Sequence, residues 1–128
     1  MIHIKKDHEI EAMRLAGGVS STVLREVAAY VKPGMSTLEI DQYGGERIRH
    51  HGGKSAFLGY RDYPCNTCIS VNEEVVHGLA SQRRVQFGDI VSVSVQEVPV
   101  ALVGCEPRLP VIPVSYTHLR AHETVLEL

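Results

Sequence analysis

Apolar residues recur at helical spacing over the first quarter of the chain. They return every three or four positions, which predicts an amphipathic helix from about residue 7, through Ile10, Met13, Ala16, Val23, Val27 and Val31. Asp7 is the expected N-cap. The helix is expected to stop at Lys32-Pro33-Gly34, because proline cannot continue it.

A second helix is predicted to begin at Ser36. Glu39 follows three residues later, which is the capping-box pattern. Apolar positions continue to Ile48, and His51-Gly52-Gly53 is expected to end the helix.

Two later segments alternate apolar and polar residues, as half-buried strands do. They are Cys68–Asn72 and Asp89–Val95. Helices first and strands afterwards favour an α+β fold, with the helices packed on one face of a mostly antiparallel sheet.

Composition narrows the class of protein. With 128 residues, 44% hydrophobic and 22% charged, the chain fits one globular domain or part of a larger one. Its net charge of -2 gives no electrostatic footprint for nucleic acid. No run approaches the roughly 18 apolar residues of a membrane span. The N-terminus lacks a signal-peptide core, and three cysteines fit a reducing compartment. We therefore expect a cytoplasmic protein with neither nucleic-acid nor membrane partners.

Cys65 and Cys68 form a C-x-x-C pair, which raises two minor alternatives. A redox pair usually opens a helix after a strand, whereas this one follows Pro64 and leads into a predicted strand. A structural zinc site needs a second pair of ligands, for which only Cys105 and scattered histidines remain.

His77 lies between two valines and a glycine, just beyond the first predicted strand. On local sequence alone, a packed and hydrogen-bonded side chain is the simpler interpretation. A catalytic role requires a cleft and a partner, and residue spacing shows neither.

Several consecutive runs together resemble type I methionine aminopeptidases. They lie in that family's order and close to its spacing, at Pro33–Asp41, Ser55–Tyr60, Tyr63-Pro64, Cys68–Glu73, Val75–Gly78 and Gly88–Val91. The resemblance implies the N-terminal half of a pita-bread fold, in which two related αβ halves enclose a two-metal site. It also implies removal of the initiator methionine from nascent proteins. Residues 1–113 would then be a partial catalytic domain, of which 95–113 fit poorly.

The resemblance also assigns site residues. The histidine matching His77 contacts the scissile peptide and helps stabilise the tetrahedral intermediate or the leaving amine, which imidazole can do near neutral pH. The positions matching Phe57, Tyr60, Tyr63 and Cys68 line the methionine side-chain pocket, where aromatic rings and a thiol suit a thioether. Phe57 replaces a smaller residue, which narrows this pocket.

The expected metal ligands are not intact. The family binds two divalent metal ions through two Asp, one His and two Glu. Ser94 and Cys105 occupy the positions of the two Asp, and neither is a conservative replacement. The other ligands belong to a C-terminal half that this sequence does not include. We therefore expect this chain to bind the ions poorly and to be inactive.

The last residues do not fit the family. Prolines at 99, 107, 110 and 113 crowd a stretch where central strands are expected. Residues 114–124 resemble a translated sequencing adapter, so 114–128 is interpreted as a non-native tail. Either a frame slip near residue 94 or true divergence explains Ser94 and Cys105.

Three functions follow from these patterns. The first is a fragment of a methionine aminopeptidase, whose partners are nascent peptides with N-terminal Met, the ribosome and the missing C-terminal half. The second is a non-catalytic, metal-site-deficient homologue that binds N-terminal peptides. The third is a proline-directed peptidase or creatinase of the same fold.

Overall fold

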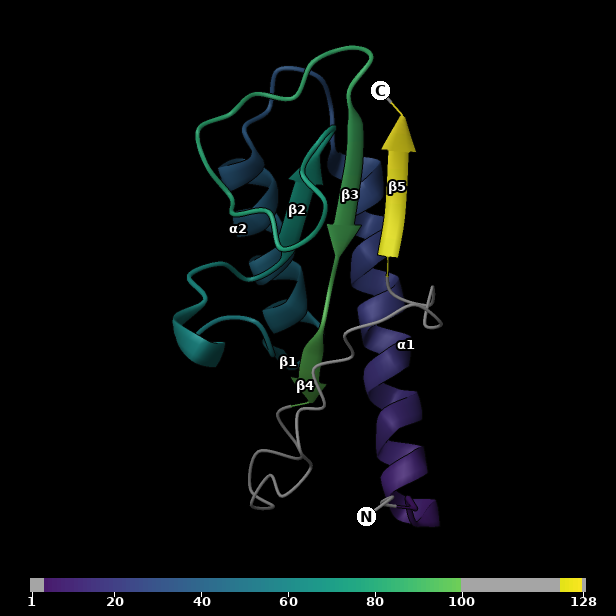
Figure 1. Cartoon of the computed structure of the whole chain (residues 1–128). Coiled ribbons are helices and arrows are strands. Elements are labelled where there is room, and N and C mark those ends of the chain that lie inside the picture. Colours follow the sequence, from purple (N-terminus) through teal and green to yellow (C-terminus); the bar gives the residue numbers. More distant parts are fainter. Residues whose placement is uncertain (1–3, 100–122, 128) are drawn as a thin grey trace.

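The computed structural model describes residues 4–99 and 123–127, and it has the predicted α+β architecture. Helices α1 (Asp7–Tyr30) and α2 (Thr37–His50) pack against each other and lie behind the strands (Figure 1). The expected placement of helices on one face of an antiparallel sheet is confirmed.

The helix ends follow the capping signals, with one correction. In α2 the Ser36 backbone N–H donates to the Glu39 carboxylate (2.7 Å), and the Glu39 N–H donates to Ser36 Oγ (3.2 Å), as the capping box predicts. For α1 the predicted N-cap, Asp7, is wrong. Lys6 is the cap and donates its backbone N–H to Glu9 at 2.7 Å, so Asp7 lies in the first turn. There its negative charge interacts favourably with the positive, N-terminal end of the helix dipole and so stabilises the helix.

Two strands match the alternating segments. They are β2 (Cys68–Val71) and β3 (Ile90–Ser94), which pair antiparallel with Cys68 opposite Ser94 and Val71 opposite Val91. The strand β5 (Glu123–Glu127) pairs with the other edge of β3, so the sheet order is β2-β3-β5. Apart from β5, the predicted tail of 114–128 lies outside the described residues.

Besides β5, three short elements were not predicted. Strands β1 (Gly53–Ser55) and β4 (Glu97–Pro99) pair antiparallel in a second, two-stranded sheet, and η1 is a 3-10 turn at Tyr60–Asp62. Pro99 therefore does not prevent strand pairing, because it lies at the last residue of β4, opposite Gly53. Pro107, Pro110 and Pro113 lie outside the described residues.

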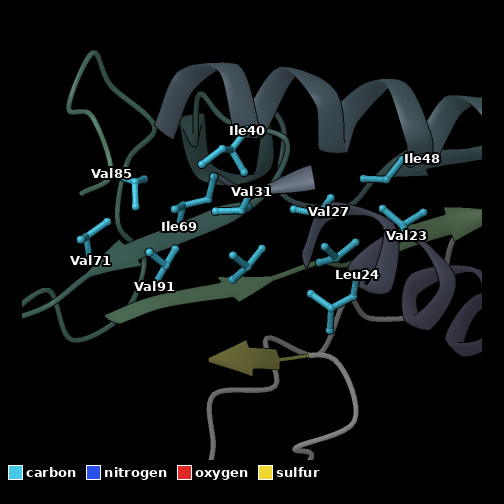
Figure 2. Close-up of a cluster of buried hydrophobic side chains, with 12 residues drawn as sticks. Val23, Leu24, Val27, Val31, Ile40, Ile48, Ile69, Val71, Val85 and Val91 are labelled. Atoms are coloured by element: carbon cyan, nitrogen blue, oxygen red, sulfur yellow. The ribbon is translucent and has the colours of Figure 1, made fainter. Parts of the chain in front are cut away.

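The core lies between the two helices and the strands (Figure 2). β-Branched side chains fill most of it, since they suit both the inner face of a sheet and a tightly packed helix contact. The buried apolar residues of this core are Val23, Leu24, Val27, Val31, Ile40, Ile48, Ile69, Val71, Val85, Val91, Val93 and Val95.

Outside the core, an ion-pair cluster joins the two helices. Glu26 of α1 accepts bonds from Arg47 Nε (2.7 Å) and Nη2 (2.9 Å) of α2. The His51 ring lies 3.2 Å from the same carboxylate. The Arg47 hydrogen bonds lower the pKa of Glu26 from 4.5 to about 2, with a smaller contribution from His51.

Some large apolar side chains remain exposed, most prominently in the loop that follows β2. Val75 is 87% and Val76 62% exposed, which leaves an apolar surface beside His77. None of the helices described is long and apolar enough to cross a membrane.

Candidate functional site

Four of the five predicted substrate-site residues lie close together around the start of β2. The segment that carries Phe57 and Tyr63 reaches this point from β1, and the loop that carries His77 returns to it after β2. The site is therefore built from two loops that fold back onto the buried strand between them.

Tyr63 connects these segments. Its ring lies against Phe57 with centroids 5.9 Å apart. Its hydroxyl is 3.0 Å from the Gly78 carbonyl and 3.2 Å from the Thr67 carbonyl, and it also hydrogen-bonds with the Cys68 thiol. A hydroxyl has one proton and two acceptor lone pairs. Tyr63 is the donor in each of these contacts, so its single proton is shared among the two carbonyls and the Cys68 sulfur.

Cys68 links Tyr63 to His77. Its side chain is buried, and Sγ lies 3.7 Å from His77 Nδ1. Burial raises the pKa of the Cys68 thiol, and burial also raises the pKa of Tyr63 well above its ordinary value. At neutral pH the site therefore presents an uncharged thiol and phenol beside an imidazole.

His77 itself is exposed, so the interpretation of a packed core histidine is wrong. Its backbone has φ 57°, a left-handed conformation that is uncommon outside glycine and that histidine tolerates better than most residues. The next residue explains how the conformation is held. Gly78 N–H donates to Ser70 Oγ (3.2 Å), and Gly78 O accepts from Ile69 N–H (3.3 Å).

Gly78 is required here because the two backbones approach so closely. A Cβ atom at Gly78 would collide with the carbonyl oxygen of Ile69. The Val-His-Gly run thus fastens an exposed histidine to a buried strand.

Tyr60 is placed differently from the other predicted residues. It begins the 3-10 turn η1 and is 36% exposed, with the Arg61 guanidinium 5.5 Å from its ring centroid. Its predicted place in a methionine pocket stays a prediction.

Asp41 is a residue of this region that the sequence analysis missed. It is buried in α2, and its carboxylate accepts four hydrogen bonds from Asn66 and Thr67, the two residues before Cys68. A lone aspartate in a helix gives no sign of burial. The available signal was the pair Gly44-Gly45 on the same helix, since adjacent glycines allow a segment to pack closely.

The described residues differ from the family pattern of metal ligands. Among residues 4–96, no three His, Cys, Asp or Glu side chains gather in a metal-binding group. Ser94 lies opposite Cys68 in the sheet, and a hydroxyl beside a thiol is a poor match for hard divalent cations, which prefer carboxylates. Cys105 lies outside the described residues. The donors described here do not fit a two-metal site.

Cys65 and Cys68 are both free and buried. Burial raises the pKa of each thiol, whereas a redox pair needs a lowered one. The structure therefore disfavours the redox alternative. The zinc alternative lacks further ligands among the described residues.

Comparison with known proteins identifies a family for most of this chain. The model of metallopeptidase family M24 matches residues 11–96. A methionine aminopeptidase of Clostridium acetobutylicum is 42% identical over 94 residues, covering 73% of this chain and 38% of that protein. The Escherichia coli K12 methionine aminopeptidase is 43% identical over 113 residues, which is 87% of this chain and 43% of that protein. The chain thus spans about two fifths of the length of these relatives.

Solved structures give the same result. A methionine aminopeptidase of Thermotoga maritima superposes with a TM-score of 0.74 at 43% identity, over 77% of this chain and 40% of that one. The prolidase of Pyrococcus furiosus reaches a TM-score of 0.64 at 19% identity, over 75% of this chain and 27% of that one, which shows a shared pita-bread fold alone. The resemblance to methionine aminopeptidases is confirmed, and this chain belongs to metallopeptidase family M24.

Proposed function

We propose that this chain is the methionine-recognising part of an enzyme that removes N-terminal methionine from proteins. The observation that carries the proposal is the meeting of Tyr63, Cys68 and His77 around one buried strand. The names of the relatives, methionine aminopeptidases of several bacteria, support the choice of methionine.

Each residue has a role that its surroundings support. The Phe57 and Tyr63 rings and the uncharged Cys68 thiol form an apolar, polarisable surface, to which a thioether binds through dispersion and sulfur–aromatic contact. His77 lies beside this surface and is exposed. Its imidazole can therefore donate a hydrogen bond to the peptide that follows the methionine. Tyr60 would close the outer edge of the same pocket.

The chain as written is proposed to be inactive. Ser94 supplies a neutral hydroxyl where a carboxylate is needed, and the described residues offer no other group of ligands. The family name implies a metallopeptidase, and two divalent ions are part of the proposal for the whole enzyme.

Two measurements on the same preparation test the proposal. We expect no methionine release from the tripeptide Met-Ala-Ser with or without added Mn²⁺ or Co²⁺, as followed by chromatography. We also expect saturable binding of Met-Ala-Ser by calorimetry, weakened in Cys68→Arg, which fills the site, and retained in the surface variant Glu11→Gln. Metal-dependent release would contradict inactivity. Failure of the chain to prefer Met-Ala-Ser over Ser-Ala-Ser would contradict methionine recognition.

A non-catalytic binding protein is the second candidate, and Ser94 is the observation that favours it. If the natural gene encodes Ser94 and Cys105, the metal site is lost while the methionine-binding residues remain. The test requires that resequencing of the locus first confirms Ser94 and Cys105. Binding of Met-Ala-Ser that EDTA does not change would then support this candidate. Aspartates at both positions in the resequenced locus would exclude it.

The partners and the compartment follow from the same proposal. The substrates would be nascent peptides with an N-terminal methionine, which the enzyme would bind at the ribosome in the cytoplasm. Free buried cysteines suit a reducing compartment. The exposed valines at 75 and 76 would be covered by a C-terminal half like that of the longer relatives.

A further inference from the structure

The carboxylate of Asp41 is saturated with hydrogen bonds from one short segment. Oδ1 accepts from the Thr67 backbone N–H and from Thr67 Oγ1, both at 2.7 Å. Oδ2 accepts from the Asn66 backbone N–H at 3.2 Å and from Asn66 Nδ2 at 3.1 Å. Asp41 is only 3% exposed, so these donors replace the water that a carboxylate needs.

Helix α2 lies directly against this segment, which leaves it little freedom to move. A Cβ atom at Gly44 would lie 2.8 Å from Thr67 Cγ2, and one at Gly45 would lie 2.6 Å from Asn66 Cγ. Both approaches are shorter than real Cβ contacts allow. The segment is therefore clamped from one side by helix backbone and held by a buried charge.

The clamped segment leads straight into the candidate site. Thr67 precedes Cys68, and the Thr67 carbonyl lies 3.2 Å from the Tyr63 hydroxyl. The same hydroxyl lies 3.0 Å from the carbonyl of Gly78, the residue after His77. Displacing Thr67 by a fraction of an ångström would therefore change the surroundings of Tyr63, Cys68 and His77 together.

We propose that Asp41 is a positioning residue, which holds Asn66 and Thr67 so that Tyr63, Cys68 and His77 meet in the geometry that binds methionine. The role in methionine binding rests on the proposed function, but the effect of Asp41 on the positions of the three side chains can be measured without any peptide. The competing view is that Asp41 only stabilises the fold. The two views differ in what happens to the site while the protein is still folded.

The variant Asp41→Asn separates these views. It keeps the size of the side chain, but one oxygen becomes an NH₂ group, which faces N–H donors instead of accepting from them. The matched control is Glu26→Gln, which weakens the contact between α1 and α2 on surface residues away from the site. Urea is used to bring the variants to the same folded fraction.

The readout is the NMR signal of the Tyr63 and His77 rings in ¹³C-labelled protein, with Tyr63→Phe and His77→Gln used to assign them. We expect both ring signals to shift in folded Asp41→Asn and to stay at their wild-type positions in Glu26→Gln. A folded Asp41→Asn protein with wild-type ring signals overturns the proposal, because Asp41 would then be structural only.

A milder variant covers the case in which Asp41→Asn does not fold. Thr67→Val removes only the hydroxyl that donates to Asp41 and keeps the methyl group that faces Gly44. We expect smaller shifts of the same two ring signals. Unchanged signals in Thr67→Val, with loss of stability alone, would contradict the proposal.

Peptide binding distinguishes this proposal from the proposed function. If the wild-type chain binds Met-Ala-Ser, Asp41→Asn is expected to weaken binding about tenfold, while Glu26→Gln leaves it unchanged at equal folded fraction. If the wild-type chain does not bind, methionine recognition fails, and the ring signals still decide whether Asp41 positions the site. Equal binding by wild type and Asp41→Asn would overturn the positioning role.

Discussion

The ion-pair cluster between the two helices makes the stability of this chain depend on pH. The Glu26 carboxylate holds Arg47 through two hydrogen bonds, and His51 lies beside it. We expect Glu26→Gln to destabilise the fold at neutral pH, because glutamine keeps the shape of the side chain but loses the charge that both partners face.

The magnitude follows from the pKa of Glu26. A fall from 4.5 to about 2 on folding corresponds to an upper limit of about 3 kcal/mol. The Glu26 side chain is 28% exposed, so water screens the pair, and we expect about 1 kcal/mol. The folded-state pKa lies below the unfolded one. The stabilisation is therefore complete above pH 4.5 and is lost as the pH falls towards 2.

Urea unfolding followed by far-UV circular dichroism measures this effect at pH 7 and at pH 2.5. The control is Glu11→Gln, an exposed glutamate in the same helix, which we expect to be neutral at both values. The difference between wild type and Glu26→Gln is expected at pH 7 and should largely vanish at pH 2.5. Equal stability at pH 7, or an equal loss at both pH values, would refute the reasoning.

Other changes test the core and the site. Ile69→Ala removes a fully buried side chain from β2 and is expected to lower the free energy of unfolding by about 2–5 kcal/mol, measured with urea. A smaller loss would mean that the core is loosely packed around Ile69. Gly78→Ala places a Cβ against the Ile69 carbonyl and should both destabilise the fold and shift the His77 ring signal in NMR, so an unchanged signal would exclude the close approach described here. Cys65 and Cys68 should react slowly with iodoacetamide at pH 7 and faster above pH 9, because burial raises the pKa of both thiols; rapid labelling at neutral pH, located by mass spectrometry, would contradict this.

Much of the fold was predictable because its signals are local. Neighbouring residues determine the N-cap of α2 at Ser36 and the end of α1 before Pro33. The alternation of apolar and polar residues in β3 is visible in its own sequence. The strands β1 and β4 have three residues each, too few to show any periodicity, and they exist because each pairs with the other across the chain.

The site was predictable only in part, and for a different reason. The resemblance identified Tyr63, Cys68 and His77, and the structure brings these three together. The burial of Asp41 had only an indirect signal, the glycine pair on the same helix, because its four donors lie some 25 residues away in sequence. The exposure of His77 was equally hidden, since it depends on how Gly78 meets a strand that precedes it. Contacts between segments that are not neighbours in sequence, rather than local propensity, decide both.

The strand β5 has a consequence for how this molecule behaves in solution. With β2 on one side and β5 on the other, the backbone of β3 is paired along both of its edges. Removing residues 123–127 would leave a row of N–H and C=O groups on β3 open to any extended chain nearby, including another copy of this one. The last few residues would then act as a cap against fibrous self-association, whatever their origin. Their loss to proteolysis would open this edge of β3 and favour aggregation.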